Sequence, residues 1–171
     1  DASTVGAYTV TYNVSDAEGN AAVAVVRTVN VVDTTAPAIT LTGNATVTVE
    51  AVSTYTDAGA TASDSYDGTL TVAATSTVDA NTVGAYTVTY NVSDAAGNAA
   101  TAVVRTVNVV DTTVPVITLT GNATVTVEAV STYTDAGATA TDNLTASITA
   151  TSTVDASTVG AYTVTYNVSD A

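Results

Sequence analysis

The sequence predicts an all-β fold made of tandem β-sandwich domains, each of about seven antiparallel strands, with essentially no helix. Three observations predict it. Threonine and valine dominate the chain, and both are β-branched residues that suit a pleated, half-buried surface. Apolar and polar residues alternate over short runs, which turn residues separate about every 8–12 positions. No segment combines an apolar period of about 3.6 residues with helix caps.

An internal repeat organises the chain and indicates several domains. Two phrases recur: VGAYTVTYNVSDA at 5–17, 83–95 and 159–171, and ITLTGNATVTVEAVSTYTDAGATA at 39–62 and 117–140. The copies differ in length at one loop, where DSYDGTLTV at 64–72 aligns with the shorter DNLTASI at 142–148. We therefore expect neighbouring copies to share one fold.

The boundaries between domains are expected where Asp-Thr-Thr-x-Pro interrupts two apolar runs. Pro37 and Pro115 fix φ in these segments and cannot donate a hydrogen bond inside a central ladder. This places the last two strands of one domain in residues 1–33, a complete domain in 34–111, and a third domain lacking its last strand in 112–171. An odd number of strands would bring the two ends of each domain out at opposite poles.

Alternation within the complete domain predicts strands at 38–42, 45–50, 60–63, 70–76, 85–92 and 100–110. Gly43 and Asn44 form a predicted tight turn between the first two strands. Residues 94–98 form a predicted hairpin loop between the last two, in which Gly97 or Asn98 takes a positive φ.

The last predicted strand contains a charged residue, Arg105. Arg105 alternates in step with the apolar residues that follow it in the strand. Its side chain would therefore point inward unless Val103 and Val104 form a bulge. We expect this bulge, with Arg105 on the surface beside a carboxylate such as Glu50. Arg27, its counterpart in the first copy, is expected to behave in the same way.

The penultimate strand places Tyr86, Val88 and Tyr90 on one face. Its pattern Gly-x-Tyr-x-Val matches the tyrosine corner of immunoglobulin domains, and Tyr8 and Tyr162 repeat it. The alternative is that these tyrosines simply fill a core that is poor in other aromatic residues. Both interpretations place them inside the domain.

The whole sequence resembles the Ig-like repeats of large bacterial surface and adhesin proteins, which also occur in some pesticidal crystal proteins and are related to hyalin-type repeats. The resemblance is carried by DTTxPxITLTG at 33–43 and 111–121, STYTDAGATA at 53–62 and 131–140, and GAYTVTYNVSDAAGN at 84–98. It implies a β-sandwich module that serves as a spacer or an adhesive element. The loop at 142–148 departs from it, because it has no counterpart of Asp67 and Gly68.

Charge and composition exclude several functions. The net charge is −14, from 16 acidic residues against two arginines, with no lysine, histidine or cysteine. Such a chain repels nucleic acid phosphates and anionic lipids, so we expect no nucleic-acid partner. No apolar run reaches the roughly 18 residues needed to span a bilayer, so we expect no membrane insertion in this segment. Without a nucleophile–base pair or a zinc-type cluster, we expect no enzyme and no catalytic residue.

Calcium is the chemistry that the acidic residues fit best. Asp57, Asp64 and Asp67 lie close in one loop region, and Asp33 and Asp111 lie at the junctions. Carboxylates that converge at a junction would bind Ca²⁺ and stiffen it. The spacing is not that of an EF-hand loop, and the same residues are also common turn formers and solubility charges. The cofactor prediction is therefore either none or Ca²⁺.

The expected function is mechanical. We expect a repeat module of an extracellular bacterial stalk, adhesin or filament that acts as a semi-rigid spacer, because the linker lacks glycine and carries proline. Its expected partners are the neighbouring domains of the same chain and, in a filament, other copies of itself. The alternative is a carbohydrate- or surface-binding adhesive module. That function needs exposed aromatic side chains, for which Tyr55, Tyr66 and Tyr133 are the candidates.

Overall fold

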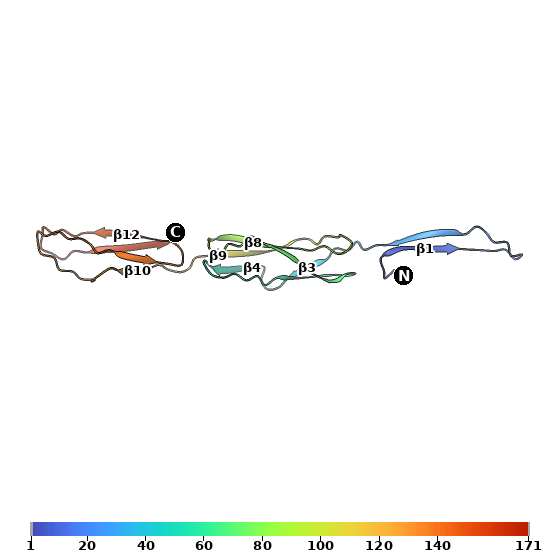
Figure 1. Cartoon of the computed structure of the whole chain (residues 1–171), viewed down its shortest axis with the longest axis horizontal. Coiled ribbons are helices and arrows are strands. Elements are labelled where there is room, and N and C mark those ends of the chain that lie inside the picture. The colour runs from blue at the N-terminus through green and yellow to red at the C-terminus, as the bar shows by residue number, and fades with distance from the viewer. Residues whose placement is uncertain (1, 171) are drawn as a thin grey trace. The chain divides into compact units, whose positions relative to one another are not determined.

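The computed structural model of the chain describes residues 2–170. Over this range it contains thirteen β-strands and no helix, so the predicted all-β fold class of Ig-like β-sandwich domains is confirmed (Figure 1). A helix suited to crossing a membrane is accordingly not found in this part of the chain.

The chain divides into two compact units, and the border between them passes through the middle copy of the repeat. One unit contains Asp1–Asn44, Ala58–Thr75 and Thr89–Val104, and the other contains Ala45–Asp57, Ser76–Val88 and Arg105–Ala171. The domain boundaries after residues 33 and 111 stay a prediction. The three copies of the repeat are named the N-terminal copy (residues 1–33), the middle copy (34–111) and the C-terminal copy (112–171).

The N-terminal copy forms an antiparallel hairpin of β1 (Gly6–Tyr12) and β2 (Val25–Val31). The carboxylate of Asp16 closes the loop between them, because its Oδ1 accepts the backbone N–H of Asn20 at 2.8 Å. Gly19 lies in this loop at a φ of 90°, a conformation that glycine adopts without strain.

The middle copy forms two sheets, one with the order β3-β5-β6 and one with the order β4-β9-β8-β7. Their strands are β3 (Ala38–Leu41), β4 (Thr46–Glu50), β5 (Ala60–Asp64), β6 (Gly68–Leu70), β7 (Ala73–Ser76), β8 (Gly84–Asn91) and β9 (Val103–Val110). The predicted strand at 70–76 is two short strands, separated by Thr71 and Val72. The other strands begin and end within a few residues of the predicted positions.

Strand β4 runs parallel to β9, with Thr46 opposite Thr106 and Glu50 opposite Val110. All the other strand pairs whose register is known among the described residues are antiparallel. Because β9 is the last strand of the middle copy, β4 forms only when the end of the copy returns beside its beginning.

The C-terminal copy contains β10 (Val116–Leu119), β11 (Ala138–Thr141), β12 (Ala146–Ser152) and β13 (Val164–Asp170). Strand β10 pairs with β11 and β12 pairs with β13, and β11 also contacts β12 while β10 contacts β13. Residues 122–131 repeat the sequence around β4 but form no strand. The reason is that the counterpart of β9, which would pair with them, is not within residues 112–171.

The buried core of the middle copy is small and aliphatic apart from one tyrosine. Val88 and Tyr90 of β8 and Val107 and Val109 of β9 are each at most 1% exposed. The parity of Val88 and Tyr90 correctly predicts that they face inward, and the neighbouring strand supplies the other two side chains.

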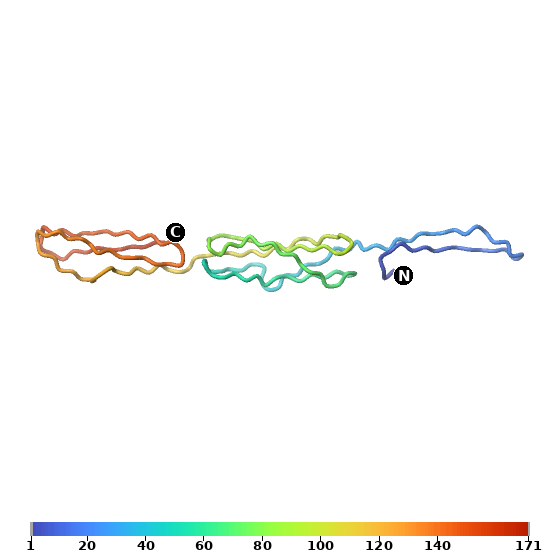
Figure 2. Tube along the Cα trace, in the orientation of Figure 1, coloured from blue at the N-terminus to red at the C-terminus, as the bar shows by residue number. Residues whose placement is uncertain are grey.

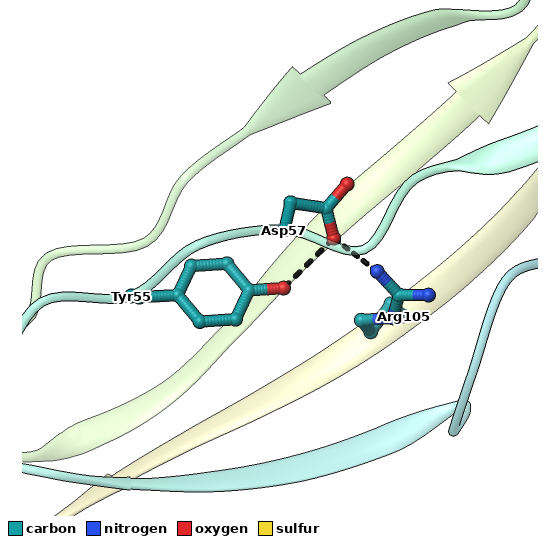
Figure 3. A network of polar contacts seen from close by, with 3 residues as sticks. All are labelled: Tyr55, Asp57 and Arg105. Carbon is teal, nitrogen blue, oxygen red and sulfur yellow. Dashed lines mark hydrogen bonds and ion pairs between the residues drawn. The ribbon is translucent and has the colours of Figure 1, made fainter.

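Arg105 is buried with this core, so its predicted surface position is wrong. Burial alternates without interruption along β9, so the predicted bulge at Val103 and Val104 is also wrong. Arg105 is 1% exposed and forms an ion pair with Asp57, which also accepts the hydroxyl of Tyr55 at 2.9 Å (Figure 3). Burial and the bond to Asp57 raise the pKa of Tyr55. A charged residue occupies the inward face because a carboxylate on another segment neutralises it.

Arg27 does not behave like Arg105. It is exposed on β2, and its guanidinium carbon lies 5.7 Å from the ring centroid of Tyr12, within the range of a cation–π contact. The two arginines differ in their partners. Arg105 is buried against Asp57, which stands 48 residues earlier in the sequence, whereas Arg27 lies against a tyrosine of its own hairpin.

Two valines adopt a left-handed backbone conformation. Val52 has a φ of 62° and its counterpart Val130 a φ of 66°. Val52 lies in the turn after β4, where the N–H of Ser53 donates to the carbonyl of Glu50 at 3.2 Å. The N–H of Val52 donates to the carbonyl of Ala80 at 2.7 Å. Since β-branched residues are strained at positive φ, these bonds hold Val52 in a conformation that glycine would adopt more easily.

Candidate functional site

Each copy of the penultimate strand carries a tyrosine that bonds back to the preceding turn. The hydroxyl of Tyr86 donates to the carbonyl of Thr82 at 2.8 Å. The equivalent bonds join Tyr8 to Thr4 at 2.8 Å and Tyr162 to Thr158 at 2.9 Å. The predicted tyrosine corner is therefore confirmed in all three copies. Tyr86 is half-buried whereas Tyr90 is fully buried, so the corner tyrosine holds the turn and Tyr90 fills the core.

Three aspartates from separate segments meet beside the linker that enters the middle copy. Asp33 follows β2, Asp64 is the last residue of β5, and Asp94 lies in the loop between β8 and β9. One carboxylate oxygen of each lies within 4.8 Å of those of the other two. Asp33 and Asp64 are half-buried, and Asp94 is 8% exposed. These residues are called the first aspartate cluster.

Backbone hydrogen bonds hold one oxygen of Asp33 and one of Asp64. Oδ1 of Asp33 accepts the N–H of Thr35 at 3.0 Å, and Oδ1 of Asp64 accepts the N–H of Tyr66 at 2.7 Å and of Asp67 at 3.2 Å. The other oxygen, Oδ2, is buried on both residues and has no hydrogen-bond partner among residues 2–170. Each side chain is thus fixed in orientation with one oxygen left over.

Asn98 fixes the third member of this cluster. Its backbone and side-chain amides both donate to the carboxylate of Asp94 at 2.7 Å, and the side-chain amide also donates to the carbonyl of Asp33 at 3.3 Å. Burial alone would raise the pKa of Asp94, but the bonds from Asn98 outweigh it and the pKa is lowered. Gly97 takes the positive φ, 94°, that is predicted for Gly97 or Asn98.

The C-terminal copy repeats this arrangement. Asp111, Asp142 and Asp170 stand at the positions equivalent to the first aspartate cluster, and their carboxylate oxygens again lie within 4.8 Å of one another. Both oxygens of Asp142 are buried, and no amide or hydroxyl group of the described residues donates to them. The pKa of Asp170 is raised, chiefly by the neighbouring carboxyl group of Asp142 and further by partial desolvation and the charge of Asp111. These residues are the second aspartate cluster.

The linker between the middle and C-terminal copies is bound by one glutamate. Glu50 ends β4 and accepts the backbone N–H of Thr112 at 2.9 Å and of Thr113 at 3.2 Å, as well as both threonine hydroxyls at 2.7 and 3.0 Å. The backbone and hydroxyl bonds from Thr112, with those from Thr113, lower the pKa of Glu50 from the usual 4.5 to about 2. Asn143 of the C-terminal copy donates to Glu50 at 3.3 Å and to the carbonyl of Ala51 at 3.4 Å. Figure 2 follows the trace from β9 through this linker into the C-terminal copy.

The predicted pairing of Glu50 with Arg105 is wrong. The carboxylate binds the linker instead, while Arg105 faces Asp57 in the core.

Comparison with known proteins identifies the fold family. The sequence model of the family described as bacterial surface protein, Ig-like domain, matches residues 39–109 and again residues 117–171. These matches cover more than half of the chain. The chain belongs to this family. The predicted resemblance to tandem bacterial Ig-like repeats is thereby confirmed.

No curated protein is similar to this Ig-like chain at a significant level. Among solved structures, a lipoprotein from Bacteroides thetaiotaomicron is 26% identical over 46% of the chain, with a TM-score of 0.40. The chain spans 39% of that lipoprotein's length.

The five aspartates predicted to bind calcium lie in different places in these Ig-like copies. Asp33 and Asp64 belong to the first aspartate cluster, and Asp111 belongs to the second. Asp67 lies next to the first cluster, but its Oδ2 accepts the N–H of Ala95 at 2.8 Å. Asp57 is in neither cluster, because it is held in the ion pair with Arg105.

Sequence reasoning missed Asp94, Asp142 and Asp170. A signal for them existed. Asp94 and Asp170 occupy the same position in the recurring phrase VSDA, and Asp142 aligns with Asp64 at the start of the loop that differs in length. Their local pattern is that of turn residues. They were missed because nothing in the local sequence shows that the loop after β8 lies beside the linker.

The tyrosines that are candidates for the alternative adhesive function largely form contacts within the chain. The hydroxyls of Tyr55 and Tyr133 donate to Asp57 and Asp135 at 2.9 and 3.0 Å. Tyr66 is 48% exposed, and its hydroxyl accepts the N–H of Val5 at 3.2 Å beside a hollow of about 220 Å³.

Proposed function

We propose that this chain is a semi-rigid spacer of an extracellular bacterial stalk, adhesin or filament, and that its role is structural. The family supports the setting, because it consists of Ig-like domains of bacterial surface proteins. The observation that carries the proposal is the binding of the linker by Glu50. A spacer must transmit position from one domain to the next, so its linkers have to be held.

The contacts of Glu50 restrict the linker at several points. Hydrogen bonds to an ionised acceptor are among the stronger ones in proteins, and here two consecutive backbone amides and two hydroxyls share one carboxylate. Pro115 follows two residues after Thr113 and fixes its own φ. With Asn143 bound to the same carboxylate, both the linker and a loop of the next copy are tied to the end of β4. These restraints favour a stiff linker over a random coil.

The other junction has restraints of its own. Asn98 of the middle copy donates to the carbonyl of Asp33 in the preceding linker at 3.3 Å. Tyr66 accepts the N–H of Val5 from the N-terminal copy at 3.2 Å. Both junctions therefore support the same role, although they use different residues.

Spin-label distance measurements test the proposal. The chain has no cysteine, so Thr48→Cys on β4 and Ser147→Cys on β12 give a uniquely labelled pair at exposed positions. A spacer gives a narrow distance distribution between these labels. Glu50→Ala is expected to broaden it toward that of a flexible tether, because the linker loses its anchor.

Glu128→Ala is the matched control. Glu128 is the counterpart of Glu50 in the C-terminal copy, and the linker it would bind is not within this chain. It should leave the distribution unchanged. A distribution that is already broad in the unmodified labelled chain would refute the spacer role.

A further inference from the structure

The two aspartate clusters carry more negative charge than the chain itself neutralises. Each gathers three carboxylates with oxygens within 4.8 Å of one another. The sequence provides two arginines and no lysine or histidine for the whole chain. Arg105 is paired with Asp57, and Arg27 lies over the ring of Tyr12. Neither arginine belongs to a cluster.

The buried oxygens of these clusters point to a missing partner. Oδ2 of Asp33, Oδ2 of Asp64 and both oxygens of Asp142 are shielded from solvent, and no amide or hydroxyl group of the described residues donates to them. Carboxylate oxygens that are removed from water without a partner are unfavourable, and buried charges are normally paired or coordinate a metal. Meanwhile Thr35, Tyr66 and Asn98 hold the remaining oxygens in place. The side chains of the first aspartate cluster are therefore oriented in advance, and one oxygen of each lies within 4.8 Å of those of the other two.

The chemistry of the donors selects the ion. All donors are hard oxygens, and the chain has no histidine or cysteine to bind a softer metal. Ca²⁺ accepts six to eight oxygens in flexible geometry, whereas Mg²⁺ requires a near-ideal octahedron and usually keeps several waters with one or two carboxylates. Three carboxylates, which can each bind through one or two oxygens, match Ca²⁺ better.

We propose that each cluster binds one Ca²⁺, through Asp33, Asp64 and Asp94 in the middle copy and through Asp111, Asp142 and Asp170 in the C-terminal copy. The site goes beyond the spacer role and does not depend on it. Asp57 and Asp67, which the sequence suggested as ligands, are not part of it. Asp33 and Asp111 lie in the linkers, so the bound ion fastens each linker to the loops of the copy that follows.

Calorimetric titration of the full chain with CaCl₂ at about 0.15 M ionic strength tests the site. We expect saturable binding of two ions per chain, one for each cluster, with Kd on the order of 10⁻⁴–10⁻³ M, as in extracellular calcium modules. Asp64→Asn should abolish binding of the ion at the first cluster, and Asp142→Asn should abolish binding at the second. The double variant should bind neither ion. Asp79→Asn removes the same charge from an exposed turn and should leave both ions bound.

A second measurement separates a lost site from a lost fold. If the clusters are repulsive without an ion, Asp64→Asn should melt at a higher temperature than the unmodified chain in EDTA, and it should respond less to Ca²⁺. Non-saturable uptake, two ions still bound to the double variant, or equal binding of MgCl₂ would each overturn the proposal. The same holds for an Asp64→Asn chain that melts lower in EDTA.

Discussion

Removing the carboxylate that faces Arg105 tests how the middle copy is held together. Asp57→Ala leaves the guanidinium in place without this partner. The Arg105 side chain is 1% exposed and that of Asp57 is 26% exposed, so Arg105 cannot reach water unless the core around β8 and β9 opens. We therefore expect the middle copy to lose a large part of its stability.

The size of the loss follows from this burial. Removing one partner of a buried ion pair costs about 3–5 kcal/mol, and the partial exposure of Asp57 favours the lower end, about 3 kcal/mol. With a urea dependence of about 1–3 kcal/mol per molar, the unfolding midpoint should fall by about 1–3 M. Urea unfolding followed by circular dichroism measures the shift. Hydrogen exchange of peptides from β8 and β9 assigns it to the middle copy.

Two further variants decide whether the buried charge is the cause. Asp135→Ala removes the equivalent residue of the C-terminal copy, which accepts the hydroxyls of Tyr133 and Tyr166, and it should shift the midpoint less. Asp57→Leu combined with Arg105→Met removes both charges and should recover most of the loss. The reasoning is refuted if Asp57→Ala has no larger effect than Asp135→Ala, or if the double replacement is as unstable as Asp57→Ala.

Four other changes have defined outcomes. Tyr86→Phe removes the corner hydrogen bond to Thr82 and should cost about 1 kcal/mol in chemical unfolding; no change would mean that the bond adds nothing. Val52→Gly should raise the melting temperature in calorimetry, because it relieves a positive φ that costs a valine about 1–3 kcal/mol; a decrease would contradict the strain. Since the pKa of Glu50 is lowered from 4.5 to about 2, its contribution is present above pH 4.5 and is lost as the pH falls to about 2. Melting temperatures over this window should thus fall more steeply for the unmodified chain than for Glu50→Gln, and equal slopes would argue against the linker contact. EDTA should lower the melting temperature of the calcium-loaded chain, and an unchanged melt would argue against a stabilising calcium ion.

Local sequence predicted the strands and the tyrosine corner well because both depend on near neighbours. The alternation around Tyr86 and Val88 fixes which side chains face inward, and Gly-x-Tyr places the hydroxyl of Tyr86 within reach of Thr82, four residues earlier. The same logic failed for Arg105. Its parity correctly pointed inward, but the charge argued for the surface, and the carboxylate that permits burial is 48 residues away.

The candidate site was only partly predictable for a similar reason. Asp33 and Asp64 stood out because they lie at a junction and in a polar loop. Asp94 joins them because β8 and β9 bring their connecting loop beside the linker, which is a property of strand order. Asp142 and Asp170 follow from the repeat once the first cluster is known.

The segment NATVTVEAVS shows the limit of local information most directly. At 44–53 it contains β4, and at 122–131 the identical sequence forms no strand. A strand needs a partner for its backbone groups, and β9 supplies one in the first case only.

The parallel pairing of β4 with β9 has a mechanical consequence. A force applied to the two ends of the chain would enter the middle copy before β3 and leave it after Val110, where β9 ends. The five residue pairs between β4 and β9 are then loaded in shear, so their hydrogen bonds must fail together. A hairpin such as β1 and β2, pulled apart at its open end, would instead unzip one bond at a time. The ladder that closes the middle copy is therefore also the element of that copy that resists force along the chain.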